Sequence, residues 1–198
     1  SHLEEAGVKC TPAGDFGVTL DSALPVAQIP LFSDGAVSVQ DQSAQLTGAV
    51  VEVNKGLRVL DVCSAPGSKA CHLAELGARV TAMDVSASRL TRVEENTRRL
   101  ALSIDTLVGD GRNLDSAAID RDFDLVLLDV PCSATGVMRR NPDVKLIRRK
   151  SDIAQFAELQ HALLNSAWQK VRPGGLLLYV TCSLLPAENE EQIDGFLA

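Results

Sequence analysis

From Gly56 onward, short runs of apolar residues alternate with longer segments in which apolar and polar residues are interleaved. The short runs are rich in Val and Leu, which is typical of strands buried on both faces of a parallel sheet. The longer segments have the spacing of amphipathic helices. This alternation predicts successive βα units, so we assign the chain to the α/β class, with a mostly parallel twisted sheet and helices on both faces.

The pattern places the individual elements. We expect strands at Leu57–Asp61, Arg79–Asp84, Asp105–Val108, Asp124–Asp129 and Leu176–Thr181, and helices at Lys69–Glu75, Ala87–Leu100, Ile153–Val171 and Ala187–Leu197. A further helix is expected at Gln42–Val53, with Asp41 as its cap. Residues 1–40 carry three prolines and several glycines, which favours an irregular or β-hairpin lead-in before a single domain at 41–198. Trp168 and Phe156 have helical spacing and are expected in the core.

Composition narrows the class of protein. With 45% hydrophobic and 23% charged residues, the chain has the profile of a soluble globular domain. No run approaches the roughly 18 apolar residues of a membrane span, and the N-terminus does not resemble a signal peptide, so we expect a cytoplasmic protein. The five cysteines are scattered, with no CxxC pair and no nearby histidines. We therefore expect neither a disulfide framework nor a bound metal.

Charge is distributed unevenly. The net charge of −7 is unfavourable for binding a phosphate backbone, which depends largely on Lys and Arg. Yet six basic residues are concentrated in one short segment that contains a single acid, Asp143. These six are Arg139, Arg140, Lys145, Arg148, Arg149 and Lys150. This basic segment is either a solvated face or a local site for RNA phosphates.

The loop after the first expected strand is the first candidate site. Small residues between Cys63 and Lys69 allow backbone N–H groups to approach a ligand closely, at the sheet edge where open α/β folds bind ligands. The loop is neither a GxGxxG turn nor a phosphate-binding loop ending in GK[ST]. Asp84 ends the next strand, where a carboxylate can accept both hydroxyls of a ribose, and Asp110 follows the third, where it can accept from an adenine amino group. Together these positions favour an adenosyl ligand.

Two further segments place a thiol at a strand end. Cys132 follows Asp129 in the segment DVPCSATG, whose Ser/Thr/Gly loop can wrap a planar base, and Cys182 follows the fifth strand in YVTCS. The C5 atom of cytosine becomes nucleophilic when a thiolate adds to C6 and converts the ring to an enamine. A carboxyl group beside N3 or the exocyclic amine would hold the base, a role that suits Asp129. Methylation of cytosine at C5 therefore needs a cysteine, which either strand end could supply.

Three segments, CSAPGSK, DVPCSATGVMRRNPDVK and YVTCSLLPAENE, resemble motifs I, IV and VI of the RNA cytosine-5 methyltransferases of the Sun family. The resemblance runs from about Phe32 to the end and includes VQDQSAQ at Val39–Gln45. It implies a Rossmann-like class I methyltransferase fold that uses S-adenosyl-L-methionine. Ser64, Ser68 and Ala70 depart mildly from the family pattern.

The resemblance also implies residue roles. Cys182 would be the nucleophile, Cys132 would assist release of the methylated product, and Asp129 would lie between cofactor and cytosine. DNA cytosine-5 methyltransferases instead use the cysteine of motif IV, the position of Cys132, as nucleophile. The implied cofactor residues are Cys63, Ser64, Ala65, Pro66, Gly67, Ser68, Lys69, Asp84, Arg89, Asp110 and Asp129.

The branch that this chain resembles most is bacterial and methylates one cytosine of 16S rRNA. The alternative within the family is a tRNA or another rRNA site. Members of this branch usually carry an N-terminal RNA-binding domain resembling the antiterminator NusB, and nothing in this chain matches it. We expect RNA to be bound through the basic segment, and a monomer is assumed. Two other classes are less favoured, namely an RNA-binding module without catalysis and a nicotinamide dehydrogenase, which lacks its GxGxxG turn here.

Overall fold

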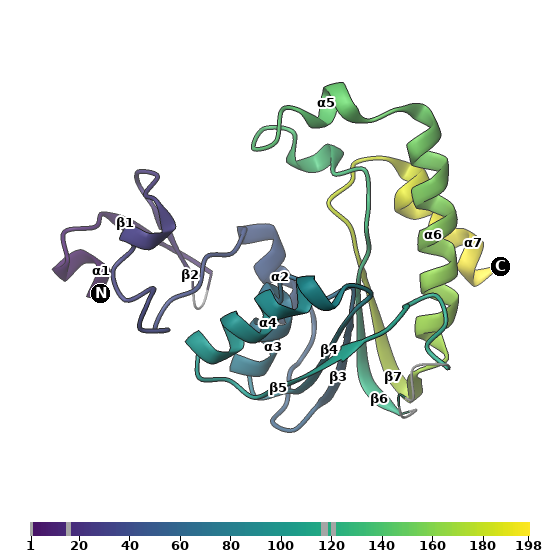
Figure 1. Ribbon diagram of the computed structural model, residues 1–198, viewed down its shortest axis with the longest axis horizontal. Coiled ribbons are helices and arrows are strands. Elements are labelled where there is room, and N and C mark those ends of the chain that lie inside the picture. Colours follow the sequence, from purple (N-terminus) through teal and green to yellow (C-terminus); the bar gives the residue numbers. More distant parts are fainter. Residues whose placement is uncertain (1, 15–16, 116–118, 120–121) are drawn as a thin grey trace.

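The computed structural model describes residues 2–14, 17–115, 119 and 122–198, and its centre is a five-stranded sheet (Figure 1). The strands are β3 (Arg58–Val62), β4 (Arg79–Asp84), β5 (Ile104–Val108), β6 (Phe123–Asp129) and β7 (Val171–Val180). They lie in the order β5-β4-β3-β6-β7, and all neighbouring pairs are parallel. The α/β class and all five expected strands are confirmed.

Helices cover both faces of this sheet. On one face lie α2 (Gln42–Val50), α3 (Ser68–Glu75) and α4 (Ala87–Arg99), and on the other lie α6 (Lys150–Trp168) and α7 (Glu190–Leu197) (Figure 1). The remaining helical segments are short: α1 (His2–Glu5), α5 (Val144–Ile147), η1 (Val26–Gln28), η2 (Thr135–Val137) and η3 (Pro186–Glu188). Among the described residues, no helix is long and apolar enough to cross a membrane.

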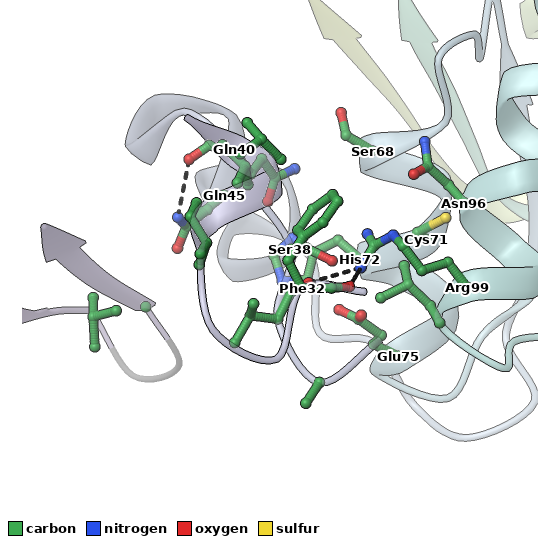
Figure 2. A pocket seen from close by; sticks show the side chains of 18 of the residues that line it. Phe32, Ser38, Gln40, Gln45, Ser68, Cys71, His72, Glu75, Asn96 and Arg99 are labelled. Carbon is green, nitrogen blue, oxygen red and sulfur yellow. Dashed lines mark hydrogen bonds between the residues drawn. The ribbon is translucent and has the colours of Figure 1, made fainter. Parts of the chain in front are cut away.

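The lead-in packs beside α3 and α4. Within it, β1 (Cys10–Ala13) and β2 (Gly17–Leu20) pair antiparallel; residues 1, 15 and 16 lie outside the described residues. Arg99 of α4 holds the lead-in against this helix by donating hydrogen bonds to the carbonyl oxygens of Phe32 and Val37 at 2.8 and 2.9 Å. Its guanidinium also lies 3.9 Å from the centre of the Phe32 ring. A cavity of about 490 Å³ remains between the lead-in and these helices (Figure 2).

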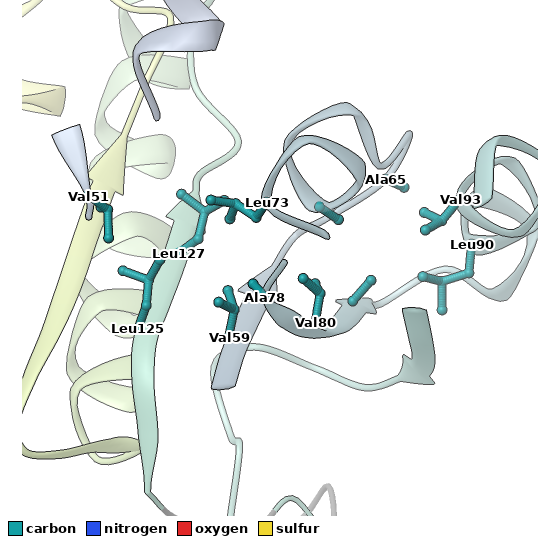
Figure 3. Close-up of a cluster of buried hydrophobic side chains, with 12 residues drawn as sticks. Val51, Val59, Ala65, Leu73, Ala78, Val80, Leu90, Val93, Leu125 and Leu127 are labelled. Atoms are coloured by element: carbon teal, nitrogen blue, oxygen red, sulfur yellow. The ribbon is translucent and has the colours of Figure 1, made fainter. Parts of the chain in front are cut away.

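Two apolar clusters hold the sheet between its helices. Alternate residues of each central strand point to opposite faces, so Leu125 and Leu127 of β6 join one cluster while Val126 and Leu128 join the other. The first cluster packs against α3 and α4 and includes Leu73 and other side chains drawn in Figure 3. The second packs against α6. Burial on both faces explains why these strands read as continuous apolar runs.

Strand order places the ligand-binding edge. The chain runs outward from β3 through β4 to β5, and then returns to the other side of β3 as β6. A reversal of this kind opens a crevice at the carboxyl ends of the two strands where it occurs. Here these are β3 and β6, which end at Val62 and Asp129. The first loop and Asp129 therefore lie at the edge where the sequence placed them.

Several expected boundaries were wrong. The helix expected to reach Val171 ends at Trp168, because the chain there turns to pair Val171 with Phe123 as the first residue of β7. Helix α2 ends at Val50 instead of Val53. The helix expected from Ala187 is divided at Asn189, whose side-chain amide donates to the carbonyl oxygens of Ser183 and Leu185.

The expected burial of both aromatic residues in the long helix was also wrong. Trp168 is 47% exposed and contacts Phe196 edge to face, since the helix ends there at the rim of the second cluster. Phe156 is half-buried beneath the guanidinium of Arg148, 5.0 Å from its ring centre. Helical spacing correctly identified which face of α6 packs against the sheet. It did not show how far along the helix this packing extends.

Candidate active site

The loop between β3 and α3 is fixed by its own residues. Gly67 precedes α3 with φ 93°, a left-handed conformation, and a Cβ there would lie 2.9 Å from the Val93 side chain. Glycine is therefore required for this turn to lie against α4. The Ala65–Pro66 peptide is cis. The Pro66 carbonyl accepts from Asn96 and the Ala65 carbonyl accepts from Arg89, at 3.1 and 3.0 Å.

Asp61 is a buried carboxyl group beneath this loop, and it was not among the predicted site residues. Its Oδ2 accepts from the Ser64 hydroxyl at 2.7 Å, whereas its Oδ1 is buried without a hydrogen-bond partner among the described residues. Burial, with a smaller contribution from the nearby Asp129 carboxylate, raises the pKa of Asp61 to about 7. The sequence placed Asp61 at the end of the first expected strand, and the structure adds that it is buried beside the Ser64 hydroxyl.

The two residues predicted to bind the adenosine part of the cofactor, Asp84 and Asp110, have different surroundings. Asp84 is buried at 1% exposure and accepts from the backbone N–H groups of Ala65 and Ser86 at 3.3 and 3.0 Å, so it joins the end of β4 to the first loop. Arg89 lies 3.5 Å from it. Asp110 is partly exposed and is held by Arg112, which approaches to 2.6 Å. Contact of Asp84 with a ribose and of Asp110 with an adenine stays a prediction.

An ion pair crosses the crevice between the first loop and β6. Lys69 Nζ lies 2.6 Å from Asp129 Oδ2, and the lysine side chain is the more buried of the two. The pair joins the first turn of α3 to the end of β6, across the reversal in strand order. Two predicted site residues are thus brought into contact.

The two strand-end thiols lie against each other. Cys132 Sγ and Cys182 Sγ are 3.2 Å apart, with Cys182 exposed and Cys132 buried behind it. Their loops touch through the backbone, since Gly136 N–H donates to the Cys182 carbonyl at 2.9 Å. A Cβ on Gly136 would lie 2.8 Å from that oxygen, so only glycine permits this approach. Of the pair, Cys182 is the thiol that is accessible from solvent.

The three cysteines at strand ends, Cys63, Cys132 and Cys182, differ in pKa. Burial and the neighbouring carboxylates of Asp84, Asp61 and Asp129 raise the pKa of Cys63 to about 12, which leaves it a neutral thiol. The hydrogen bond between the other two sulfurs lowers the pKa of Cys132 to about 7 and raises that of Cys182. The pair therefore loses its first proton near neutral pH and shares the second between the sulfurs.

The loop after Cys132 turns its hydroxyls toward the protein. The hydroxyls of Ser133 and Thr135 are directed inward, toward Ser183 and Glu188, because the two loops share a buried polar network. Wrapping of a planar base by this segment stays a prediction. Ser133 is 0% exposed. Glu188 and Gln160 complete this network. Neither was among the predicted site residues, although Glu188 lies in the segment YVTCSLLPAENE, whereas Gln160 comes from a distant part of the sequence.

The basic segment follows this loop. Five of its six residues are exposed, namely Arg139, Arg140, Lys145, Arg149 and Lys150. Arg148 is half-buried and donates to the Ser133 carbonyl at 3.0 Å, so it supports the Cys132 loop in addition to adding charge. Arg140 pairs with Asp41 at 3.3 Å, which brings the N-terminus of α2 to the same side.

The cavity beside the lead-in lies outside this site. Of the predicted site residues only Ser68 lines it, and neither Cys132 nor Cys182 does. Figure 2 shows its polar side chains, including His72 and Glu75 of α3 and Arg99 of α4. Among the described residues, no group of three or more His, Cys, Asp or Glu side chains is placed to hold a metal ion.

Comparison with known proteins identifies the family. A family model described as 16S rRNA methyltransferase RsmB/F matches residues 49–198. Proteins named ribosomal RNA small subunit methyltransferase B are 47% identical over 93% of this chain in Shewanella oneidensis and 46% identical over 99% in Klebsiella pneumoniae. The aligned regions are 44% and 46% of those relatives, so the chain spans less than half their length.

Solved structures share the fold. A methyltransferase homologue from Pyrococcus horikoshii superposes with a TM-score of 0.85 at 28% identity, covering 99% of this chain and 63% of that one. NSun6 from the same organism, solved with SFG, superposes with a TM-score of 0.81 at 29% identity, covering 91% of this chain and 48% of that one. The class I methyltransferase fold and the family resemblance of the three motifs are thereby confirmed. The chain belongs to the 16S rRNA methyltransferase RsmB/F family.

Proposed function

We propose that residues 41–198 are the catalytic domain of an S-adenosyl-L-methionine-dependent methyltransferase that modifies C5 of a cytosine in 16S rRNA. The observation that carries this proposal is the 3.2 Å contact between Cys132 Sγ and Cys182 Sγ, beside the Lys69–Asp129 pair at the carboxyl edge of the sheet. Cytosine C5 chemistry needs an accessible thiol next to a methyl donor site, and this edge offers both.

The residues at the ends of β3 and β4 fit an adenosyl cofactor. The backbone N–H groups of Ser64, Ala65 and Gly67 already donate within the protein, but the small residues of the first loop allow a ligand to approach closely. Among the described residues, Asp61 beneath the loop keeps an unpartnered buried oxygen. We assign cofactor contact to Cys63–Lys69, Asp84, Arg89, Asp110 and Asp129. When bound, S-adenosylmethionine supplies an electrophilic methyl group. The SFG complex of NSun6 supports an adenosyl-type ligand in this fold.

Cys182 is the nucleophile in this proposal. Its sulfur adds to C6 of cytosine, which forms a carbon–sulfur bond and moves electron density to C5. Since the thiol pair shares one proton near neutral pH, the Cys132 thiolate is placed to take the proton that Cys182 gives up. After methylation, loss of the C5 proton allows the bond between C6 and Cys182 to break.

Asp129 and Cys132 complete the assignment. The Asp129 carboxylate, held by Lys69, borders both the cofactor loop and the thiols, and we assign it to holding the cytosine through N3 or the exocyclic amine. Cys132 assists release of the methylated base. Its position directly behind Cys182 supports this role, because a proton for the departing sulfur is then available within 3.2 Å.

The RNA strand is assigned to the basic segment. Its exposed cations begin seven residues after Cys132, so phosphates flanking the target base would lie close to them. The net charge of −7 limits this surface, and additional RNA affinity is assigned to the part of the relatives' length that this chain does not span.

The test is transfer of labelled methyl groups from S-adenosylmethionine to unmodified 16S rRNA and to a tRNA pool. The proposal predicts label in 16S rRNA, present as 5-methylcytosine, and none in tRNA. If label appeared only in tRNA, the proposed substrate would be wrong, but the proposed methylation of cytosine C5 would stand. Label at any atom other than cytosine C5 would overturn the proposal.

A further inference from the structure

Glu188 is a buried carboxylate that joins the two cysteine loops. It is 0% exposed, in the η3 turn just before α7. One carboxylate oxygen accepts from the backbone N–H of Ser133 at 2.8 Å and from the Gln160 side chain at 3.0 Å. The other accepts from the hydroxyls of Ser133 and Ser183, each at 2.5 Å. All four hydrogen bonds approach the same carboxylate.

The positions of these donors give the network its importance. Ser133 directly follows Cys132, and Ser183 directly follows Cys182. The carboxylate of Glu188 thus bridges the residues next to both thiols, on the side away from solvent. The two loops come from different strands, β6 and β7, and no covalent link holds them together.

Other contacts fix the carboxylate itself. The Gln160 amide also donates to the Pro131 carbonyl at 2.9 Å, which connects the network to α6. The Tyr179 hydroxyl donates to the Glu188 carbonyl oxygen at 2.9 Å, so both ends of the glutamate are held. Burial opposes ionisation, but hydrogen bonds from Ser133, Ser183 and Gln160 outweigh it and hold the pKa of Glu188 below its usual range. An ionised, fully hydrogen-bonded group of this kind favours one geometry over others.

We propose that Glu188 is a positioning residue, whose side chain sets the distance between Cys132 and Cys182 by holding Ser133 and Ser183 together. It touches neither sulfur and no reacting atom. This inference rests on the proposed function only in the claim that the thiol pair is catalytic; the claim that Glu188 holds the pair together stands on geometry alone.

The first test needs no substrate. In the unaltered chain, the contact between the two sulfurs gives a first thiol pKa of about 7. Glu188→Ala removes the bridge, so the sulfurs should separate and this pKa should rise toward that of an isolated thiol. Loss of the Glu188 charge, which raises the pKa of Cys132, acts in the opposite direction but is a smaller effect than loss of the hydrogen bond from Cys182. Thiolate absorbance is titrated with pH, and the background of the other cysteines is subtracted with the Cys132→Ala/Cys182→Ala double variant. Glu191→Gln, an exposed acid of α7, is the matched control and should leave the titration unchanged.

The second test measures methyl transfer in the same variants. Misplacement of a nucleophile by about 1 Å costs on the order of 100-fold in rate. Glu188→Ala should therefore lower kcat about 100-fold and leave KM for the RNA nearly unchanged. Glu188→Gln keeps an oxygen for the two N–H donors, while the hydroxyls can rotate to accept from its amide. It should restore most of the rate, which a role limited to charge would not predict.

Folding is checked by circular dichroism, and Ser183→Ala covers the case in which Glu188→Ala does not fold. That variant removes one arm of the bridge and should raise the first thiol pKa by a smaller amount. An unchanged thiol titration in folded Glu188→Ala, or in Ser183→Ala when Glu188→Ala is unfolded, overturns the inference. A shifted titration together with an unaltered chain that methylates no cytosine keeps the positioning role and overturns the proposed function instead.

Discussion

The two halves of the ligand-binding edge are built differently. At the ends of β3 and β4, each carboxyl group has a partner close by in the sequence, since Asp61 accepts from Ser64 and Asp84 accepts from Ser86, although Asp84 also accepts from Ala65 across 19 positions. At the ends of β6 and β7, Glu188 accepts from Ser183 five positions away, but its contacts with Gln160 and Ser133 span 28 and 55 positions. The first half is therefore determined more locally than the second. The second forms only when α6, β6 and β7 have packed together.

This difference explains what the sequence could predict. The first loop was found from its small residues, and Asp84 and Asp129 from their places at strand ends. Cys132 and Cys182 were also found from their places at strand ends, and their expected roles came from the family resemblance. The inward-facing hydroxyl of Ser133 was not foreseen, because a Ser/Thr/Gly loop at a strand end looks the same whether it binds a base or an internal carboxylate.

The fold was predictable for a related reason. Residues buried on both faces give each central strand an apolar run, so β3, β4 and β6 were placed within one residue. The start of β7 was missed by five residues, because Pro173, Gly174 and Gly175 suggest a turn. Pairing of Val171 with Phe123 extends the strand before them, and that pairing cannot be read from local sequence.

The largest expected effect comes from the cysteines at the ends of β6 and β7. Cys182→Ala removes the proposed nucleophile and should lower methyl transfer by about 10⁴-fold or more. Cys132→Ala should instead retain attack and accumulate a covalent protein–RNA complex, since release is impaired. Both are measured with labelled S-adenosylmethionine and denaturing gels. Full activity of Cys182→Ala would contradict the mechanism.

The variant Asp84→Asn tests whether the two halves of the ligand-binding edge act independently. An amide in this position retains one acceptor for Ala65 and Ser86 N–H, so the first loop should loosen and affinity for S-adenosylmethionine should fall about 10-fold to 100-fold, as measured by calorimetry. The thiol titration should be unaffected, because distant sites with no shared partner act independently. A changed thiol pKa would show that the halves are coupled.

The thiol pair also predicts a pH dependence. Thiolate in the unaltered chain should appear as pH rises through about 7, the pKa of Cys132. In Cys132→Ala the Cys132 thiolate and the hydrogen bond that stabilises it are gone. Burial keeps the pKa of the remaining thiol, Cys182, above its ordinary value of 9.0. Alkylation of Cys182 by iodoacetamide should then rise only above pH 9. Equal profiles for both proteins would argue against a shared proton.

The smallest effect concerns Asp61. Its pKa is about 7 in the folded chain against an ordinary value of 3.8, so between these values the folded chain binds a proton that the unfolded chain lacks. Stability should fall as pH rises across this window, by roughly 1 kcal/mol per pH unit from this group. Asp61→Asn should flatten that slope in urea unfolding at pH 5 and pH 7. An identical slope in the variant would show that Asp61 ionises normally.

The most direct test of the central claim uses RNA that carries 5-fluorocytidine at the target position. Fluorine replaces the C5 proton that must leave, so the bond between the attacking sulfur and C6 cannot be released after methylation. With S-adenosylmethionine present, a covalent protein–RNA complex should form, and mass spectrometry of its peptides should find the nucleotide on Cys182. A nucleotide on Cys132, or a complex that still forms in Cys182→Ala, would contradict the account.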